Sequence, residues 1–68
     1  MPVKVYEAML ANPASIARVT AARPAIERTG GRVKLAPPTK SGMVLATLTL
    51  PDRYTPEDFL PGLPFYPV

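Results

Sequence analysis

The chain has 68 residues, 47% of them hydrophobic, and eight Lys and Arg residues against five Asp and Glu residues give a net charge of +3. A chain of this length forms one domain with a marginal core, because it buries only about 60% of its unfolded surface. The sequence contains no Cys or His, which excludes disulfides and the usual zinc sites and leaves association, with itself or with a larger protein, as the expected source of extra stability.

The N-terminal residues MPVKVYEAML contain a single Lys and no long apolar run, so they lack the pattern of a secretory signal. No part of the chain approaches the ~20 apolar residues that a membrane span requires. We therefore expect a cytoplasmic protein with no membrane partner.

Residues 3–10 are predicted to form the first strand. Side chains alternate along a strand, so one face carries Val3, Val5 and Met9 and the other carries Tyr6, Ala8 and Leu10. Because Glu7 interrupts the first set, we expect the Tyr6 side to face the core.

A helix is predicted to begin at Asn12-Pro13, since Asn is a favoured N-cap and Pro suits the first helical position. Ile16, Val19 and Ile26 form its apolar stripe. Pro24 removes one helical donor, so we expect a kink there, or a break followed by a second short turn over residues 25–29. The pair Gly30-Gly31 is expected to end the helix.

The run GMVLATLTL over residues 42–50 is the predicted central strand, because it is uncharged, apolar and β-branched and ends at Pro51. One of its faces carries Val44, Ala46, Leu48 and Leu50, and the other carries Met43, Leu45, Thr47 and Thr49. Residues 32–36 alternate charged and apolar side chains as a half-exposed strand does, and the turn-rich residues 37–42 join the two strands as a hairpin.

The C-terminal part is predicted to hold one short helix and an extended tail. Thr55-Pro56-Glu57-Asp58 has a capping residue, a proline at the first position and acids in the first turn, and Pro61 prevents a longer helix. The single domain is thus expected over residues 1–60. In residues 61–68 Pro recurs every third position, as in a polyproline II helix, and this tail either covers the chain's own core or reaches a partner.

These elements predict a small α+β fold, a truncated ferredoxin-like βαββ layer with an antiparallel sheet and one open sheet face. That face and the tail are the predicted partner-binding surface of a non-catalytic interaction module. Its expected residues are Met43, Leu45, Thr47, Thr49, Leu63, Phe65, Tyr66 and Val68.

Catalysis is not expected, because no His or Cys is present to act as base or nucleophile at neutral pH, and no cofactor or metal motif occurs. The adjacent Glu57 and Asp58 are explained by helix capping. A weaker alternative is nucleic-acid binding through a basic stripe. Its residues would be Arg18, Arg28, Arg32 and Lys34, but the open face offers no aromatic residue on the central strand for base stacking.

From the first strand to Leu50, the layout with its Thr29-Gly30-Gly31-Arg32-Val33 junction resembles the propeptides of subtilisin-like proteases and related small inhibitors. The resemblance implies a second alternative, a protease inhibitor or propeptide-like chaperone. In that family the open sheet face packs on the protease and the extended C-terminal residues lie in the substrate cleft. Here those roles would fall to the Met43, Leu45, Thr47 and Thr49 face and to Phe65, Tyr66, Pro67 and Val68.

Overall fold

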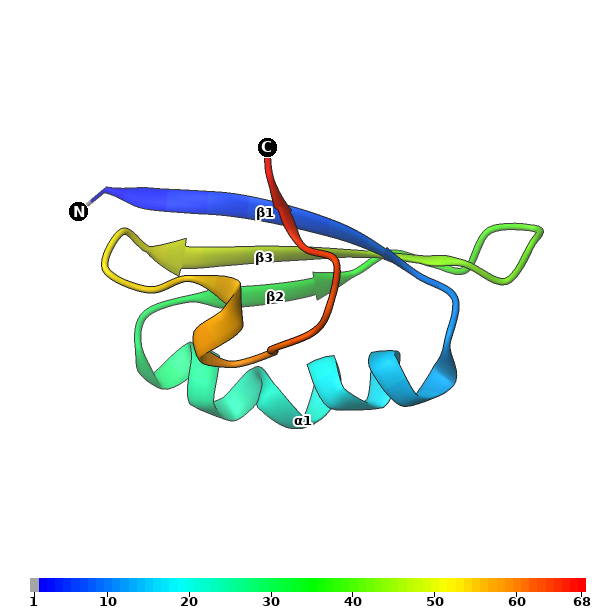
Figure 1. The fold of residues 1–68 in the computed structure, drawn as a ribbon, viewed down its shortest axis with the longest axis horizontal. Coiled ribbons are helices and arrows are strands. Elements are labelled where there is room, and N and C mark those ends of the chain that lie inside the picture. Colours follow the sequence, from blue (N-terminus) through cyan, green and yellow to red (C-terminus); the bar gives the residue numbers. More distant parts are fainter. Residues whose placement is uncertain (1) are drawn as a thin grey trace.

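The computed structural model describes residues 2–68 and places one long helix against a four-stranded antiparallel sheet (Figure 1). The elements in chain order are β1 (Val3–Leu10), α1 (Pro13–Arg28), β2 (Arg32–Leu35), β3 (Val44–Pro51), the 3₁₀ turn η1 (Pro56–Asp58) and β4 (Tyr66–Pro67). In the sheet the strands lie in the order β2-β3-β1-β4. This confirms the small α+β fold and its βαββ order, to which the structure adds a fourth strand.

The core lies between α1 and one face of the sheet. β1 and β3 pair over their full length, so Tyr6 lies opposite Leu48 and Ala8 opposite Ala46. The side chains that alternate toward the helix are buried, which confirms the predicted core face of both strands. The buried residues are Tyr6, Ala8, Leu10, Val19, Ile26, Val33, Val44, Ala46, Leu48, Leu50 and Leu60.

α1 begins as predicted, because the Asn12 side chain accepts a hydrogen bond of 2.9 Å from the backbone N–H of Ala14. Of the kink or break predicted at Pro24, the break is wrong, since the helix runs without interruption from Pro13 to Arg28, and the kink stays a prediction. Pro24 and Thr20 are both exposed, so water can reach the Thr20 carbonyl that Pro24 cannot bond. Within the described residues, no helix combines the length and apolar character needed to cross a membrane.

The turn from α1 into β2 brings the backbone of two layers together. Gly30 adopts φ +91°, which favours glycine, and ends the helix as predicted. Gly31 follows with no room for a side chain, because a Cβ there would lie 2.6 Å from the Thr49 carbonyl oxygen and 2.9 Å from Ile26 Cγ2. This turn therefore determines how closely the helix lies on β3.

The tail, residues 61–68, is extended but does not stand away from the domain. Leu63 and Phe65 pack against the core, and Arg18 Nη2 donates a 2.7 Å hydrogen bond to the Pro61 carbonyl oxygen. The last residues form β4, where Tyr66 lies opposite Glu7. Figure 1 shows α1 and η1 on the same side of the sheet, with the tail passing from that side to the edge of β1. The polyproline interpretation missed this strand pairing.

Candidate interaction surface: the open face of the sheet

The sheet has one face turned away from α1, and no other element of residues 2–68 lies over it (Figure 1). Its residues follow from strand alternation and register, and we call this surface the open face. It comprises Val3, Val5, Glu7 and Met9 of β1, Arg32 and Lys34 of β2, Leu45, Thr47 and Thr49 of β3, and Tyr66 with the adjacent Val68.

Apolar side chains exposed to solvent gather on the open face. The large hydrophobic residues that are exposed among residues 2–68 all belong to it, with exposed fractions from 37% for Val5 to 76% for Val68. They are Val3, Val5, Met9, Tyr66 and Val68. Val3, Val5, Tyr66 and Val68 lie near one another, and Glu7 separates Met9 from them along β1. Exposed apolar residues that gather in this way are typical of protein interaction sites.

The predicted site residues of the central strand lie together on this face. Leu45, Thr47 and Thr49 are half-buried and lie along β3, and Met43, also half-buried, immediately precedes that strand. Thr47 has Lys34 on one side and Glu7 on the other, and Thr49 has Arg32 and Val5. The open face thus has cations along β2 and a single acid on β1.

The predicted site residues of the tail divide between two places. Tyr66 and Val68 are exposed at the edge of the open face, whereas Leu63 and Phe65 are half-buried against the chain's own core. The sequence prediction also left out the β1 contribution of Val3, Val5 and Met9. Their alternation away from the Tyr6 side was the available signal.

Each edge of the sheet has one feature that opposes the addition of another strand. At the β2 edge, Arg23 Nη2 donates a 3.0 Å hydrogen bond to the Val33 carbonyl oxygen. At the other edge β4 has only two residues, and the Val68 N–H donates inward to the Val5 carbonyl oxygen at 2.9 Å. The neighbouring Pro67 then has its nitrogen on the outer side, where it offers no donor. Strand addition is therefore opposed at these positions.

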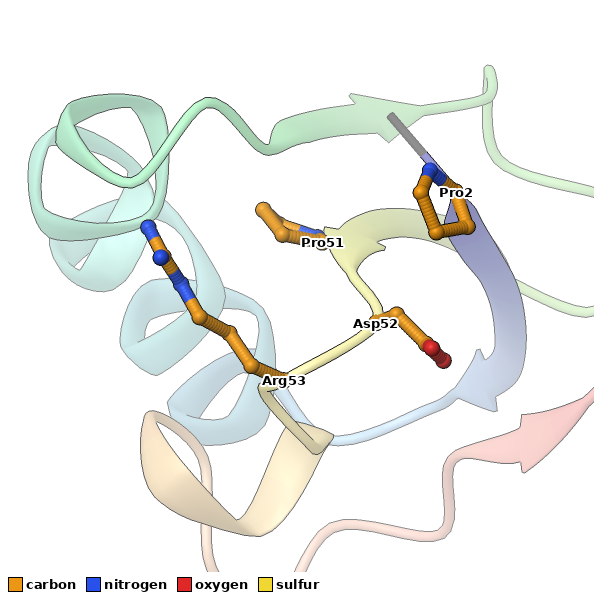
Figure 2. A pocket seen from close by; sticks show the side chains of 4 residues that line it. All are labelled: Pro2, Pro51, Asp52 and Arg53. Carbon is orange, nitrogen blue, oxygen red and sulfur yellow. The ribbon is translucent and has the colours of Figure 1, made fainter.

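Two hollows lie beside the open face. The first, of about 150 Å³, is lined by Pro2, Pro51, Asp52 and Arg53, and Figure 2 shows Arg53 extending toward the helix while Asp52 points away from it. It is smaller than the ~300 Å³ of the smallest usual ligand sites. The second is a groove of about 520 Å³ where β4 ends, lined by Val3, Lys4, Val5, Pro67 and Val68. Lys4 and Pro67 alternate toward the other face of the sheet, so this groove lies along the outer edge of β1.

One of the two acids singled out in the sequence, Asp58, has a structural role. Asp58 Oδ2 accepts a 2.8 Å hydrogen bond from the Thr55 backbone N–H, and this completes a capping box at η1. The neighbouring Glu57 is exposed in the same turn. Among residues 2–68, no three His, Cys, Asp or Glu side chains gather in a group that could hold a metal ion.

The predicted basic stripe is not continuous in the structure. Arg18 and Arg28 belong to α1, on one side of the sheet, and Arg18 already donates to the Pro61 carbonyl. Arg32 and Lys34 alternate with the buried Val33 and so belong to the open face. The four cations therefore do not form one surface for a phosphate backbone.

Comparison of the chain with protein-family models, with curated proteins and with solved structures found no match. The likeness to subtilisin propeptides therefore stays a prediction from the layout of the sequence. The open face itself, with its gathered apolar side chains and its separated charges, is the feature from which a function is inferred.

Proposed function

We propose that this chain is a non-catalytic protein–protein interaction module that associates with itself, or with a larger protein as an accessory subunit, through the open face. The observation that carries the proposal is the gathering of the exposed large apolar side chains on the one sheet face that no helix covers. Covering these side chains removes apolar surface from water at about 25 cal/mol per Å².

The size of the chain supports the same proposal. Among residues 2–68, eleven hydrophobic residues are buried on the helix side, and the chain of 68 residues has no Cys. A core of this size supplies little net stability by itself. A partner that covers the open face adds stability by mass action, because it binds the folded chain and not the unfolded one.

The two alternatives have weaker support. A protease inhibitor that resembles subtilisin propeptides needs its C-terminal residues in a substrate cleft, and here Tyr66 and Pro67 pair with β1. A nucleic-acid binder needs a continuous basic surface, and the cations are divided between the two sides of the sheet. Binding of a partner to the open face, in contrast, requires no rearrangement of the tail.

Size-exclusion chromatography with light scattering tests the proposal on the tagged chain in an extract of the cells that produce it. The wild-type chain is expected in a species heavier than the monomer, and Leu45→Lys is expected to be monomeric because it places a charge in the middle of the open face. Ala25→Lys is the matched control, since Ala25 is exposed on α1. A monomeric wild-type chain, or a complex that survives Leu45→Lys, would overturn the proposal.

A further inference from the structure

We infer that the outer edge of β1 is a separate binding site for an extended segment of another protein, and that the C-terminal tail occupies this site as an intramolecular ligand. The partner segment has the tail's pattern of prolines and apolar residues and runs two residues further along β1. The inference does not rest on the proposed function, because the site is an edge of the sheet and does not include Leu45, Thr47 or Thr49.

The tail has the properties of a bound peptide. None of residues 61–68 is buried, and the buried hydrophobic residues all precede them. The tail is anchored by Leu63 and Phe65, which are half-buried against the core, and it joins the sheet through β4 and the N–H of Val68. Gly62, at φ +84° with open space around it, precedes these anchors and allows the tail to turn away from the domain. Its regular prolines keep the tail extended when it is free, so docking costs little conformational entropy.

The edge of β1 is longer than the strand that the tail places on it (Figure 1). β1 has eight residues, and β4 pairs with Tyr6 and Glu7. The Val5 carbonyl oxygen accepts a hydrogen bond from Val68, so the backbone groups of Val5 face the outer edge. Because these groups alternate along an antiparallel strand, the N–H and C=O of Val3 face the same edge. Val3 therefore offers a donor and an acceptor past the end of β4.

The groove of about 520 Å³ lies where a longer strand would run. Its lining comes from both faces of the sheet, with Val3, Val5 and Val68 on the open side and Lys4 and Pro67 on the other. A hollow lined from both faces lies in the plane of the sheet, which is the position of the next strand. An extended backbone fills such a hollow and bonds the sheet edge at the same time. Pro67 does not oppose this, because the segment takes the place of β4.

The register predicts which residues distinguish the partner segment from the tail. A strand that replaces β4 and continues past the position of Val68 places its next residue opposite Lys4 and the following one opposite Val3. Directly opposite residues share a face, so an acid suits the first position and an apolar β-branched residue suits the second. The ion pair of Lys4 with Asp52 at 3.6 Å is exposed and weak, which leaves Lys4 available to this acid.

The tail sets the affinity that a partner must exceed. Because it belongs to the same chain, it competes at an effective concentration in the millimolar range. A free segment therefore binds in proportion to the fraction of chains whose tail has left the edge. Weakening the attachment of the tail should raise the apparent affinity for a free peptide.

Fluorescence anisotropy with labelled synthetic peptides tests the inference on the full chain. The first probe, PGLPFYPVEV, is the tail sequence followed by Glu and Val, and the second, PGLPFYPVVE, has the last two residues exchanged. Phe65→Ala removes one anchor of the chain's own tail, so this variant is expected to bind the first probe at least about tenfold more tightly than wild type does. The same variant is expected to bind the second probe roughly fivefold more weakly than the first.

Two further variants make the test specific. Tyr66→Pro is a second way to release the tail, because it removes the N–H that pairs with Glu7 and leaves the core side chains in place. It is expected to bind the first probe as Phe65→Ala does, and thermal unfolding shows that both variants are folded. Leu45→Lys, combined with Phe65→Ala, is the control for the open face and is expected to leave binding of the probe unchanged.

Four results would overturn the inference, and none of them depends on whether the chain associates through the open face. If neither Phe65→Ala nor Tyr66→Pro binds the first probe, the tail is a strap and the edge is not a binding site. If wild type binds the probe as tightly as these variants, or if Leu45→Lys abolishes binding, the peptide binds elsewhere on the chain. If the two probes bind equally, the segment does not continue along Lys4 and Val3.

Discussion

The two faces of β3 belong to the same eight residues but have opposite roles. The side chains that point to α1, Ala46, Leu48 and Leu50, are fully buried, whereas Leu45, Thr47 and Thr49 between them are half-buried. One strand therefore supplies both the core and the proposed interaction surface. Substitutions one residue apart should separate folding from association.

The two faces also differ in chemistry. The covered face consists of aliphatic side chains with the ring of Tyr6, and no buried side-chain polar atom among residues 2–68 lacks a hydrogen-bond partner. The open face combines Val, Leu and Met with Thr, two cations and Glu7. A surface of mixed character stays soluble when free and still presents apolar area to a partner.

Leucine-to-alanine substitutions on the two faces should give the largest difference. Leu48→Ala removes a fully buried side chain at the centre of the core and is expected to lower the free energy of unfolding by about 3 kcal/mol. Leu45→Ala, three residues earlier and half-buried, is expected to cost less than about 1 kcal/mol but to weaken association. Urea unfolding and sedimentation measure the two effects. Equal losses of stability would contradict the division between the faces.

Glycine-to-alanine substitutions test how closely the covered face is packed. Gly31→Ala is expected to destabilise the fold by about 2 kcal/mol, because its Cβ would meet the Thr49 carbonyl and Ile26 between the two layers. Gly42→Ala, in the hairpin loop with open space around it, is expected to cost about 1 kcal/mol from its φ of +83° alone.

Circular dichroism during thermal unfolding measures both glycine variants. Gly31 is required because a side chain would not fit, and Gly42 because its φ is positive. Asn at each position is therefore a further control. Asn tolerates the left-handed conformation and should be milder than Ala at position 42, but it should be no milder at position 31. The reverse order would show that the helix can move away from β3 without loss of stability.

Two adjacent aromatic residues, Phe65 and Tyr66, allow the covered and open faces to be compared in the tail. Phe65 packs against the core, so Phe65→Ala is expected to lower stability by about 1–2 kcal/mol, less than a fully buried ring. Tyr66 is exposed on the open face, so Tyr66→Ala should leave the unfolding midpoint nearly unchanged. Differential scanning calorimetry measures both. A tail that serves only as a partner arm would give two stable variants, contrary to this expectation.

The alternation of apolar residues was enough to predict the core faces of β1 and β3 and the β3 part of the open face. Tyr6, Leu48 and the turn at Gly30 were correctly placed from periodicity and turn chemistry, because these signals are local. The sequence did not decide between a kink and a break at Pro24, because the outcome depends on whether water can reach the Thr20 carbonyl. The pairing of β4 was also missed, because two residues carry no periodic signal and their partner strand lies almost sixty residues earlier.

For the candidate site, the sequence pattern of single segments predicted only part of the open face. Leu45, Thr47 and Thr49 were identified from one strand, but the opposition of Glu7 and Lys34 about Thr47 depends on the register of three strands. Register is specified by burial of one whole face and is not visible in any single segment. The charge pattern of the open face could therefore be recognised only in the folded sheet.

Arg23→Met should have the smallest effect on stability. It tests whether the chain associates through the open face or through an edge of the sheet. The hydrogen bond from Arg23 to the Val33 carbonyl is partly buried at the β2 edge, and its loss is expected to cost about 0.5–1 kcal/mol while Met keeps the apolar stem in place. Arg28→Met is the control, since Arg28 is exposed near the end of α1. Urea unfolding measures the cost in stability, and sedimentation at high concentration detects new assemblies.

Loss of this hydrogen bond frees the Val33 carbonyl at the β2 edge. This strand has only four residues, and the charges of Arg32 and Lys34 beside the carbonyl should still oppose strand addition. Large oligomers of Arg23→Met that persist in the presence of Leu45→Lys would show that the β2 edge, and not the open face, is the surface that needs covering.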